Sequence, residues 1–236
     1  MTAPTKIRFP GKLDGIRAKL AMRMEARLPG HVGPYVRTGP VTSNWGYGRG
    51  TPIDRWYIER FLDRHRGDIR GRVLEVGGDD YVRRFGSAIE QVDIIDINSS
   101  NARATIVTDL EAPDIVPDAT FDCFVMTQVL YRIFDVRAAL RQCARILKPG
   151  GVLLLTVPGI AMVVDPLDYW HFTRLGLARA MSEAFGPGAT EVEGHGNSCL
   201  TTAFLTGLAA EEFDTSELLA NDARFPLVLT CRALRV

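Results

Sequence analysis

Hydrophobic and polar positions divide the chain into an irregular first part and a regular second part. Residues 1–50 are rich in Gly, Pro and Arg, but apolar residues at helical spacing predict one helix over 13–28. Lys and Arg lie between these apolar positions, so the helix could bind a membrane surface; we favour packing on its own domain. A second helix is predicted over 53–65, because "RGTP" places a proline near its start.

From Arg72 onward, short apolar runs alternate with helical patterns. Five buried strands are predicted over 72–77, 92–97, 104–110, 121–128 and 152–158. The stretch "RAALRQCARILKPGG" predicts a helix that is stopped by Pro149 and the glycine pair. Helices over 175–185 and 200–213, a strand over 190–193 and a last strand in "PLVLTCRAL" complete the pattern. Near-continuous apolar strands alternating with helices indicate an α/β fold, whose mostly parallel sheet is covered on both faces.

Composition and charge narrow the possible partners. The 236 residues suit one domain with an N-terminal extension, or at most two small domains. Lys and Arg (28) balance Asp and Glu (28), so no net positive charge favours nucleic acid as a partner. The sequence shows neither a signal peptide nor an apolar stretch that could span a bilayer, and its four cysteines are widely spaced. These features predict a cytoplasmic protein without a membrane partner.

The stretch "VLEVGGDDYVRRFG" has the pattern of a strand that enters a nucleotide-binding loop. It lacks the G-x-x-x-x-G-K-[ST] run of a P-loop. It also lacks a dinucleotide fingerprint, because counting from Gly77 the second and third glycines are replaced by Asp79 and Val82. The adjacent acids Asp79 and Asp80 would repel a pyrophosphate, but they would suit S-adenosylmethionine (SAM), which carries a positive sulfonium and no phosphate.

Two carboxylates at strand ends are candidate contacts for the nucleoside. Asp96 lies 19 residues after Gly77 and could accept both ribose hydroxyl protons; alternatively it caps a following helix. Asp109 could accept a hydrogen bond from the adenine amino group, or it could cap a helix. Ile97 and Leu110 could pack against the faces of the ring.

Five segments resemble class I SAM-dependent methyltransferases in their order and spacing, over about Arg72 to Val236. They are "VLEVG", "DIIDIN", "TDL", "FDCFVMTQVLYRI" and "ALRQCARILKPGGVLLLTVP". The resemblance implies a Rossmann-like sheet of seven strands with the last strand antiparallel, and SAM as the cofactor across the ends of the first, second and fourth strands. Residues 71–236 would form this SAM-binding domain, and residues 1–70 a helical N-terminal extension and cap.

The same resemblance implies roles for particular residues. Glu75 and the glycines Gly77 and Gly78 would border the methionine part of SAM, with Gln128 close to it. Asp96 would hold the ribose, and Asp109 with Leu110 would border adenine. Tyr81, where a glycine is usual, would pack on the ligand. "NWGYGRGTPIDRWYIERFL" and "DYWHFTRLGLARAMSEAF" further resemble a bacterial subgroup that often occurs with glycosyltransferases or in secondary metabolism.

Two aromatic-rich segments outside the core pattern, "WGYGRGTPIDRWY" and "DPLDYWHFT", are predicted to form a lid over the substrate. His171 is the best candidate base, because an imidazole can accept a proton at neutral pH; a structural hydrogen bond is the alternative. Asp168 could orient His171 or bind substrate, or could simply form a turn. Asp54 could cap the helix that follows it.

The remaining candidates are weaker. Arg49 could pair with the carboxylate of the cofactor or with an acidic substrate, and Tyr57 could reach the cofactor. Further candidate substrate contacts are Trp170, Tyr169, Tyr131 and His195, and core packing is an alternative for the first two. No histidine has a partner at metal-ligand spacing, so no metal site is predicted.

These observations predict a SAM-dependent methyltransferase of a small molecule or a sugar. Oxygen is the favoured acceptor atom, because no N/D-P-P-Y-like run follows the fourth strand. Three alternatives remain open: a SAM-binding catalyst of a non-methylating reaction such as cyclisation, a non-catalytic partner with a degenerate pocket, and a Rossmann oxidoreductase. The sequence does not define the oligomeric state.

Overall fold

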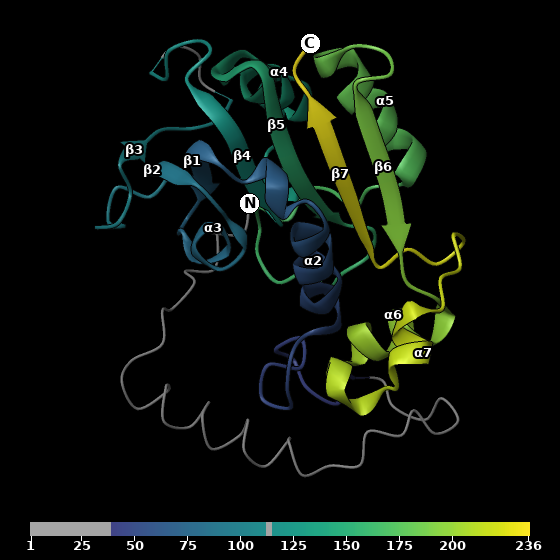
Figure 1. Ribbon diagram of the computed structural model, residues 1–236. Helices are drawn as coiled ribbons and strands as arrows, with labels where there is room; N and C mark the ends of the chain where they lie inside the picture. The colour runs from purple at the N-terminus through teal and green to yellow at the C-terminus, as the bar shows by residue number, and fades with distance from the viewer. Residues whose placement is uncertain (1–38, 112–114) are drawn as a thin grey trace, which may run out of the picture.

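A computed structural model describes residues 39–111 and 115–236, so the helix predicted over 13–28 lies outside the described residues. A seven-stranded sheet forms the centre of this part of the molecule (Figure 1). Its strands are β1 (Gly71–Val76), β2 (Ile89–Asp96), β3 (Ile106–Val107), β4 (Phe121–Thr127), β5 (Leu147–Pro158), β6 (Thr190–His195) and β7 (Val228–Leu234).

The strand order β3-β2-β1-β4-β5-β7-β6 makes the sheet doubly wound. All neighbours pair in parallel except β7, which runs antiparallel to both β5 and β6. The predicted Rossmann-like fold with an antiparallel last strand is therefore confirmed. The direction of chain progression reverses between β1 and β4, which is where ligands bind in open α/β sheets.

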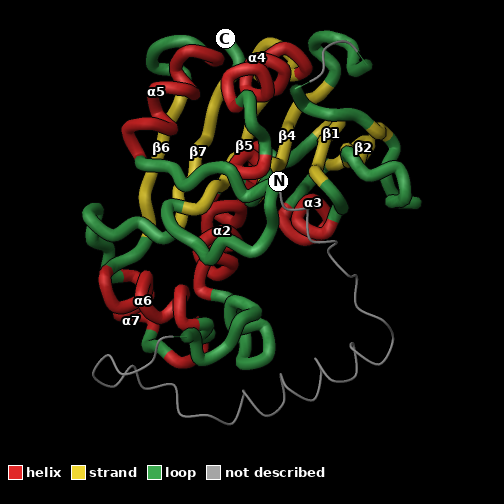
Figure 2. The backbone as a smooth tube through the Cα atoms, turned by 180° about the vertical axis from the view of Figure 1, so that it is seen from behind, coloured by secondary structure: helices red, strands yellow, loops and turns green. Residues whose placement is uncertain are grey.

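Helices cover both faces of the sheet. The α-helices are α2 (Ile53–Arg64), α3 (Asp80–Phe85), α4 (Val136–Ile146), α5 (Arg174–Phe185), α6 (Ser198–Thr206) and α7 (Thr215–Leu219). Single 3₁₀ turns form η1 (Arg66–Asp68), η2 (Leu130–Arg132) and η3 (Ala210–Glu212). One apolar core joins α2, α3 and α6 to one face of the sheet, and a second joins α4 and α5 to the other (Figures 1 and 2).

Several element boundaries differ from those predicted. The helix in "RAALRQCARILKPGG" ends at Ile146, and Leu147 already pairs with Phe121 as part of β5. Lys148 precedes a proline, and such a position disfavours helical backbone. The helix predicted over 200–213 ends at Thr206, because Gly207 adopts a left-handed conformation. The strand predicted over 104–110 is reduced to two residues, and α3 and α7 have no counterpart in the prediction.

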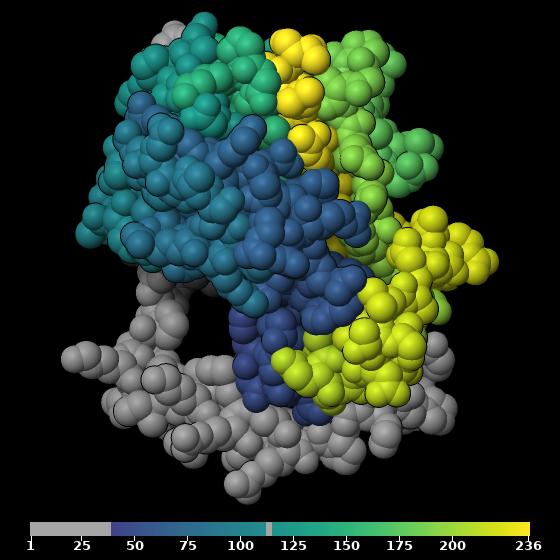
Figure 3. All heavy atoms as spheres, viewed as in Figure 1, coloured from purple at the N-terminus to yellow at the C-terminus, as the bar shows by residue number. Residues whose placement is uncertain are grey.

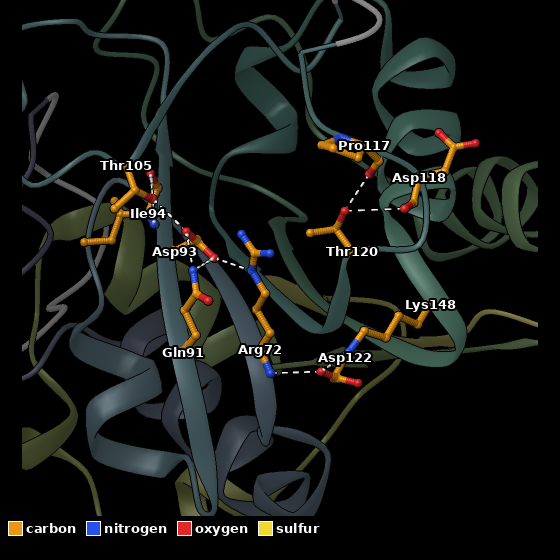
Figure 4. Close-up of polar contacts among 10 residues, drawn as sticks. All are labelled: Arg72, Gln91, Asp93, Ile94, Thr105, Pro117, Asp118, Thr120, Asp122 and Lys148. Atoms are coloured by element: carbon orange, nitrogen blue, oxygen red, sulfur yellow. Dashed lines mark hydrogen bonds and ion pairs between the residues drawn. The ribbon is translucent and has the colours of Figure 1, made fainter.

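Polar side chains link neighbouring strands near the amino-terminal ends of β1 and β4 (Figure 4). Asp93, which is buried on β2, accepts hydrogen bonds from Arg72 Nε at 2.7 Å and from Thr105 Oγ1 at 3.2 Å. Asp122 on β4 accepts from the Arg72 amide and from Lys148 Nζ, at 2.8 Å and 2.7 Å. These bonds tie β1, β2, β4 and β5 together and leave the opposite ends of the strands open for a ligand.

Candidate functional site

Two cavities share one lining residue, Gln128, which follows β4. The larger cavity, of about 600 Å³, lies at the carboxyl ends of β1 and β2 and includes Asp96, Asp109 and Phe134. The smaller cavity, of about 230 Å³, is lined by α2, the start of α3 and the segment after β5. Gln128 has a left-handed backbone, with φ 52°, and its Oε1 atom is buried without a hydrogen-bond partner in the described chain.

Asp96 and Asp109 both line the larger cavity, as the sequence predicts for nucleoside contacts. Asp96 accepts hydrogen bonds from the Asn98 amide at 2.9 Å and from Asn101 Nδ2 at 2.7 Å. Asp109 accepts from the Glu111 amide at 2.9 Å. Each carboxylate closes a turn and caps no described helix. Each also keeps lone pairs that could accept further hydrogen bonds, since a carboxylate can accept about four.

Apolar side chains also contribute to the wall around these acids. Ile97 is 71% exposed and Phe134 is 65% exposed, and both line the larger cavity with Leu110. Exposed apolar side chains beside two carboxylates form a site for a flat ring that carries polar edges. Gly77 has φ 75°, and a Cβ atom placed there would meet no atom within 4 Å, so the backbone faces open space.

Glu75, at the end of β1, is only 5% exposed. Its carboxylate accepts hydrogen bonds from the amides of Tyr81 and Val82, at 3.2 Å and 2.8 Å. These amides belong to the first turn of α3, where no intrahelical partner exists. Burial raises the pKa of Glu75 to about 7. The contacts make Glu75 a cap of α3; its predicted place beside methionine remains a prediction.

The prediction that Asp79 and Asp80 supply negative charge for a cationic ligand is wrong. Asp79 is buried and forms ion pairs with Arg83 and Arg103, and the 85% exposed Asp80 also lies 3.8 Å from Arg103. Neither aspartate lines the larger or the smaller cavity. The two arginines neutralise the acidic pair, which therefore adds no negative charge for a cationic ligand. Arg103 lies 24 residues beyond Asp79, so the local sequence pattern could not reveal this ion pair.

The smaller cavity brings together polar groups from distant parts of the chain. Asp54, Tyr131, Asp168 and His171 all line it, together with Tyr81. Gln128 Nε2 donates to Asp54 Oδ2 at 3.5 Å, and burial raises the pKa of Asp54 to about 6. The sequence suggested only a helix cap for Asp54, although its place in the predicted lid segment was a usable signal.

Asp168 holds the segment after β5 in place. Its Oδ2 atom accepts hydrogen bonds from the amides of Val164 and Asp165, at 3.0 Å and 3.1 Å. Its Oδ1 atom is buried, lacks a hydrogen-bond partner among the described residues, and lies 3.6 Å from Arg132 Nε. No hydrogen bond joins Asp168 to His171 in the described structure. Asp168 therefore forms a turn, one of the two predicted interpretations, while one of its oxygens is left without a hydrogen bond.

Several predicted site residues lie elsewhere. The Tyr57 hydroxyl donates to the Leu218 carbonyl at 2.7 Å, and its ring stacks on His195; both residues line a separate, third cavity. Arg49 donates to Glu212 at 2.7 Å and lines neither of the two joined cavities. Tyr169 lines the larger cavity, whereas Trp170 lines neither and donates from Nε1 to the Ile133 carbonyl at 3.0 Å.

The described residues contain neither a cluster of metal ligands nor a helix that could span a membrane. No group of three or more His, Cys, Asp or Glu side chains there could hold a metal ion. None of the helices in 39–111 and 115–236 has the length and apolar character needed to cross a membrane.

Solved structures share this fold. A SAM-dependent methyltransferase from Archaeoglobus fulgidus superposes with a TM-score of 0.52 at 14% identity, covering 76% of this chain and 94% of the other. A methyltransferase from Haloferax volcanii, solved with the activator Trm112, gives a TM-score of 0.51 at 18% identity, covering 77% and 93%. The sheet and the paired cavities at its switch point thus define a protein with the fold of a class I methyltransferase.

Sequence comparison identifies the family. Residues 53–185 match the methyltransferase domain family, so the chain belongs to that family. The ubiquinone/menaquinone biosynthesis C-methyltransferase UbiE of Saccharophagus degradans is 30% identical over 123 residues, which are 43% of this chain and 49% of that protein. A methyltransferase of Claviceps purpurea is 30% identical over 141 residues, which are 54% and 43%. The chain spans about half the length of these relatives.

SAM is the cofactor that this family and fold imply, and the residues present fit it. The larger cavity offers carboxylates for hydroxyl and amino protons and apolar side chains for a purine. The buried Gln128 Oε1 atom can accept a hydrogen bond from an ammonium group at the junction of the cavities. The open backbone at Gly77 leaves room for a ligand to approach.

Proposed function

We propose that the protein transfers the methyl group of SAM to an oxygen atom of a small molecule or a sugar. The observation that carries this proposal is the junction of the two cavities at Gln128. A nucleoside in the larger cavity and an acceptor in the smaller one would meet there. The resemblance to the subgroup that occurs with glycosyltransferases supports a place in glycan biosynthesis or secondary metabolism.

The larger cavity would bind the cofactor. Asp96 would accept hydrogen bonds from the ribose hydroxyls and Asp109 from the adenine amino group, while Ile97 and Leu110 would cover the ring. When bound, SAM supplies a methyl group activated by its positive sulfonium. The carbonyl of Gln128 would orient the amino acid end of the cofactor.

The smaller cavity would hold the acceptor and remove its proton. Asp54 is the preferred base, because with a pKa of about 6 it is mostly ionised at neutral pH and still basic enough to accept a proton. His171 lines the same cavity and is the second candidate. The rings of Tyr81 and Tyr131 in the wall would exclude water from the acceptor.

Calorimetry with S-adenosylhomocysteine tests the cofactor site. We expect the wild-type chain to bind it and Asp96→Ala to bind at least about 10-fold more weakly, because hydrogen bonds to a charged group contribute about 1.5–3 kcal/mol. Asp80→Asn, at the exposed neighbour of the loop, is the matched control and should bind as the wild type does. Failure of the folded wild-type chain to bind would refute the cofactor site.

The reaction is tested with SAM that carries a deuterated methyl group and a panel of hydroxylated acceptors. Mass spectrometry then shows whether a product has gained the labelled methyl group. Asp54→Asn should lower kcat by about 10²–10⁴-fold, as removal of a general base does, while S-adenosylhomocysteine affinity stays unchanged. A larger loss in His171→Ala than in Asp54→Asn would transfer the role of base to His171. A product that forms without the labelled methyl group would indicate a non-methylating reaction instead.

A further inference from the structure

The third cavity, of about 490 Å³, lies between α2, the end of β6 and residues 218–223. It shares no lining residue with the two cavities that meet at Gln128. Figure 3 shows the blue surface of α2 beside the yellow-green surface of the segment that contains α7. We call it the basic cavity, after Arg60, Arg64 and Arg174, which line it.

The charges of the basic cavity are unbalanced. Among the described residues, Glu193 is the only acidic one that lines it, and Arg64 donates to Glu193 at 2.8 Å. Arg60 and Arg174 form no ion pair with any carboxylate of the described chain. Arg60 instead stacks over the ring of Trp56, with its guanidinium carbon 4.8 Å from the ring centroid. Two guanidinium groups, from α2 and from α5, thus keep their positive charge available for a ligand.

The arginines of α2 form part of an ordered face. Trp56, Arg60 and Arg64 are spaced four residues apart, so they lie along one side of the helix. The lining also contains His195, which bonds to Thr230 Oγ1 at 2.8 Å and stacks on Tyr57 of α2. The cavity therefore combines positive groups with aromatic and apolar surface.

The positive potential reaches the buried groups of this lining. Burial lowers the pKa of His195, and Arg64 and Arg60 lower it further, against the opposing effect of Glu193. Burial also raises the pKa of Tyr57 to about 12, while Arg60 acts in the opposite direction. Neither side chain therefore supplies negative charge at neutral pH to balance the arginines.

We propose that the basic cavity binds a small organic phosphate, whose phosphate contacts Arg60 and Arg174 and whose apolar part lies against Trp56. Guanidinium groups bind phosphate through paired N–H donors. Two unpaired guanidinium groups match the charge of a dianion better than that of a single carboxylate. The aromatic wall adds affinity for a planar or apolar group that inorganic phosphate lacks. This site is separate from the proposed methyl transfer and does not depend on it.

The proposal is tested by measuring the binding of phenyl phosphate at low salt, with calorimetry and with tryptophan fluorescence. We expect saturable binding that weakens with added salt, as charge pairing requires. The double variant Arg60→Gln/Arg174→Gln should bind at least about 10-fold more weakly. Arg66→Gln/Arg179→Gln changes two exposed arginines that pair with nearby acids, and should bind as the wild type does.

Three further measurements locate the ligand. Trp56→Phe should lose the fluorescence change while calorimetric binding persists. Inorganic phosphate should bind more weakly than phenyl phosphate, and a saturating amount of S-adenosylhomocysteine should displace neither. Undiminished binding by Arg60→Gln/Arg174→Gln, absence of saturable binding, or displacement by S-adenosylhomocysteine would each overturn the proposal. Arg60 and Arg174 are both exposed, so circular dichroism should show the double variant to be folded.

Discussion

The surroundings of Asp54 raise the pKa of its carboxyl group. Asp54 lies in the first turn of α2, lines the smaller cavity and accepts a long hydrogen bond of 3.5 Å from Gln128 Nε2. Burial raises its pKa from 3.8 to about 6, because the charged form loses contact with water. A carboxylate that the folded chain shields from water lowers the stability of the fold when it is ionised, and such groups are concentrated at functional sites.

This property predicts how Asp54→Asn affects stability at different pH values. Well below pH 3.8 the carboxyl is protonated in both the folded and the unfolded chain, so ionisation of Asp54 has no effect on stability. Between about pH 4 and pH 6 the unfolded chain ionises first, and the stability of the wild type falls as pH rises. Above pH 6 the loss of stability is complete. It amounts to about 3 kcal/mol, because each unit of the pKa shift costs about 1.4 kcal/mol.

Asp54→Asn removes this loss, because the amide carries no charge. Urea denaturation from pH 4 to pH 8 should therefore show a variant that gains stability over the wild type as pH rises to 6, and keeps the gain above it. Asp63→Asn, on an exposed part of the same helix, should differ from the wild type by less than about 0.5 kcal/mol at every pH. A constant difference for Asp54→Asn across this range would contradict the prediction.

Prediction from the sequence reached some residues of the site and missed others. Asp96 and Asp109 were predicted from their places at strand ends, and Gln128 from the resemblance to methyltransferases; all three line the larger cavity. The ion-pair partner of Asp79 was not predicted, because Arg103 lies 24 residues further along the chain. The burial of Asp54 was also missed, since burial depends on how α2 packs against the rest of the chain.

At the scale of elements, a single glycine decides where α6 stops. Gly207 has φ 78°, and a Cβ atom there would lie 2.3 Å from the carbonyl oxygen of Thr42. Thr42 is buried and its hydroxyl donates to the Gly207 carbonyl at 3.0 Å, so the helix end is packed against the segment before α2. Neither the backbone nor its neighbour leaves room for a side chain.

Gly207→Ala and Gly188→Ala make a matched pair, because both glycines have φ near 78° but a Cβ atom at Gly188 would meet nothing within 4 Å. Gly188→Ala should lose about 1 kcal/mol of stability from backbone strain alone. Gly207→Ala should lose at least about 2 kcal/mol more, as overpacking does. Chemical denaturation at pH 7 checks both values, and equal losses would show that the contact with Thr42 relaxes easily.

The elements that were predicted well are those with long apolar runs. β1, β4 and β5 are buried on both faces, so their hydrophobic runs are continuous and their existence could be read directly. β3 was overestimated because it lies at the edge of the sheet, where Ile106 and Val107 pair with β2 as a regular strand and Thr105 and Thr108 add one backbone hydrogen bond each. α3 was missed because its first turn is capped by Glu75, from the strand before it, and not by an adjacent residue.

At the scale of the whole molecule, a cofactor that binds only the folded chain raises its melting temperature. S-adenosylhomocysteine at 100 times its Kd should stabilise the fold by about 2.7 kcal/mol. For a chain of this size we expect a Tm increase of about 5–10 °C, at 2–4 °C for each kcal/mol. Differential scanning fluorimetry measures it. NADH should give no increase, and an increase with NADH alone would favour the oxidoreductase alternative.

Gln128 also has a consequence for the evolution of the protein. Its left-handed backbone and its buried, unpartnered carbonyl both lower stability. Glycine at this position would relieve both, but would remove the side chain that joins the two cavities. In a library of variants selected only for survival of heating, glycine should therefore become frequent at position 128. Selection for turnover should remove it, so the two selections would drive this one codon in opposite directions.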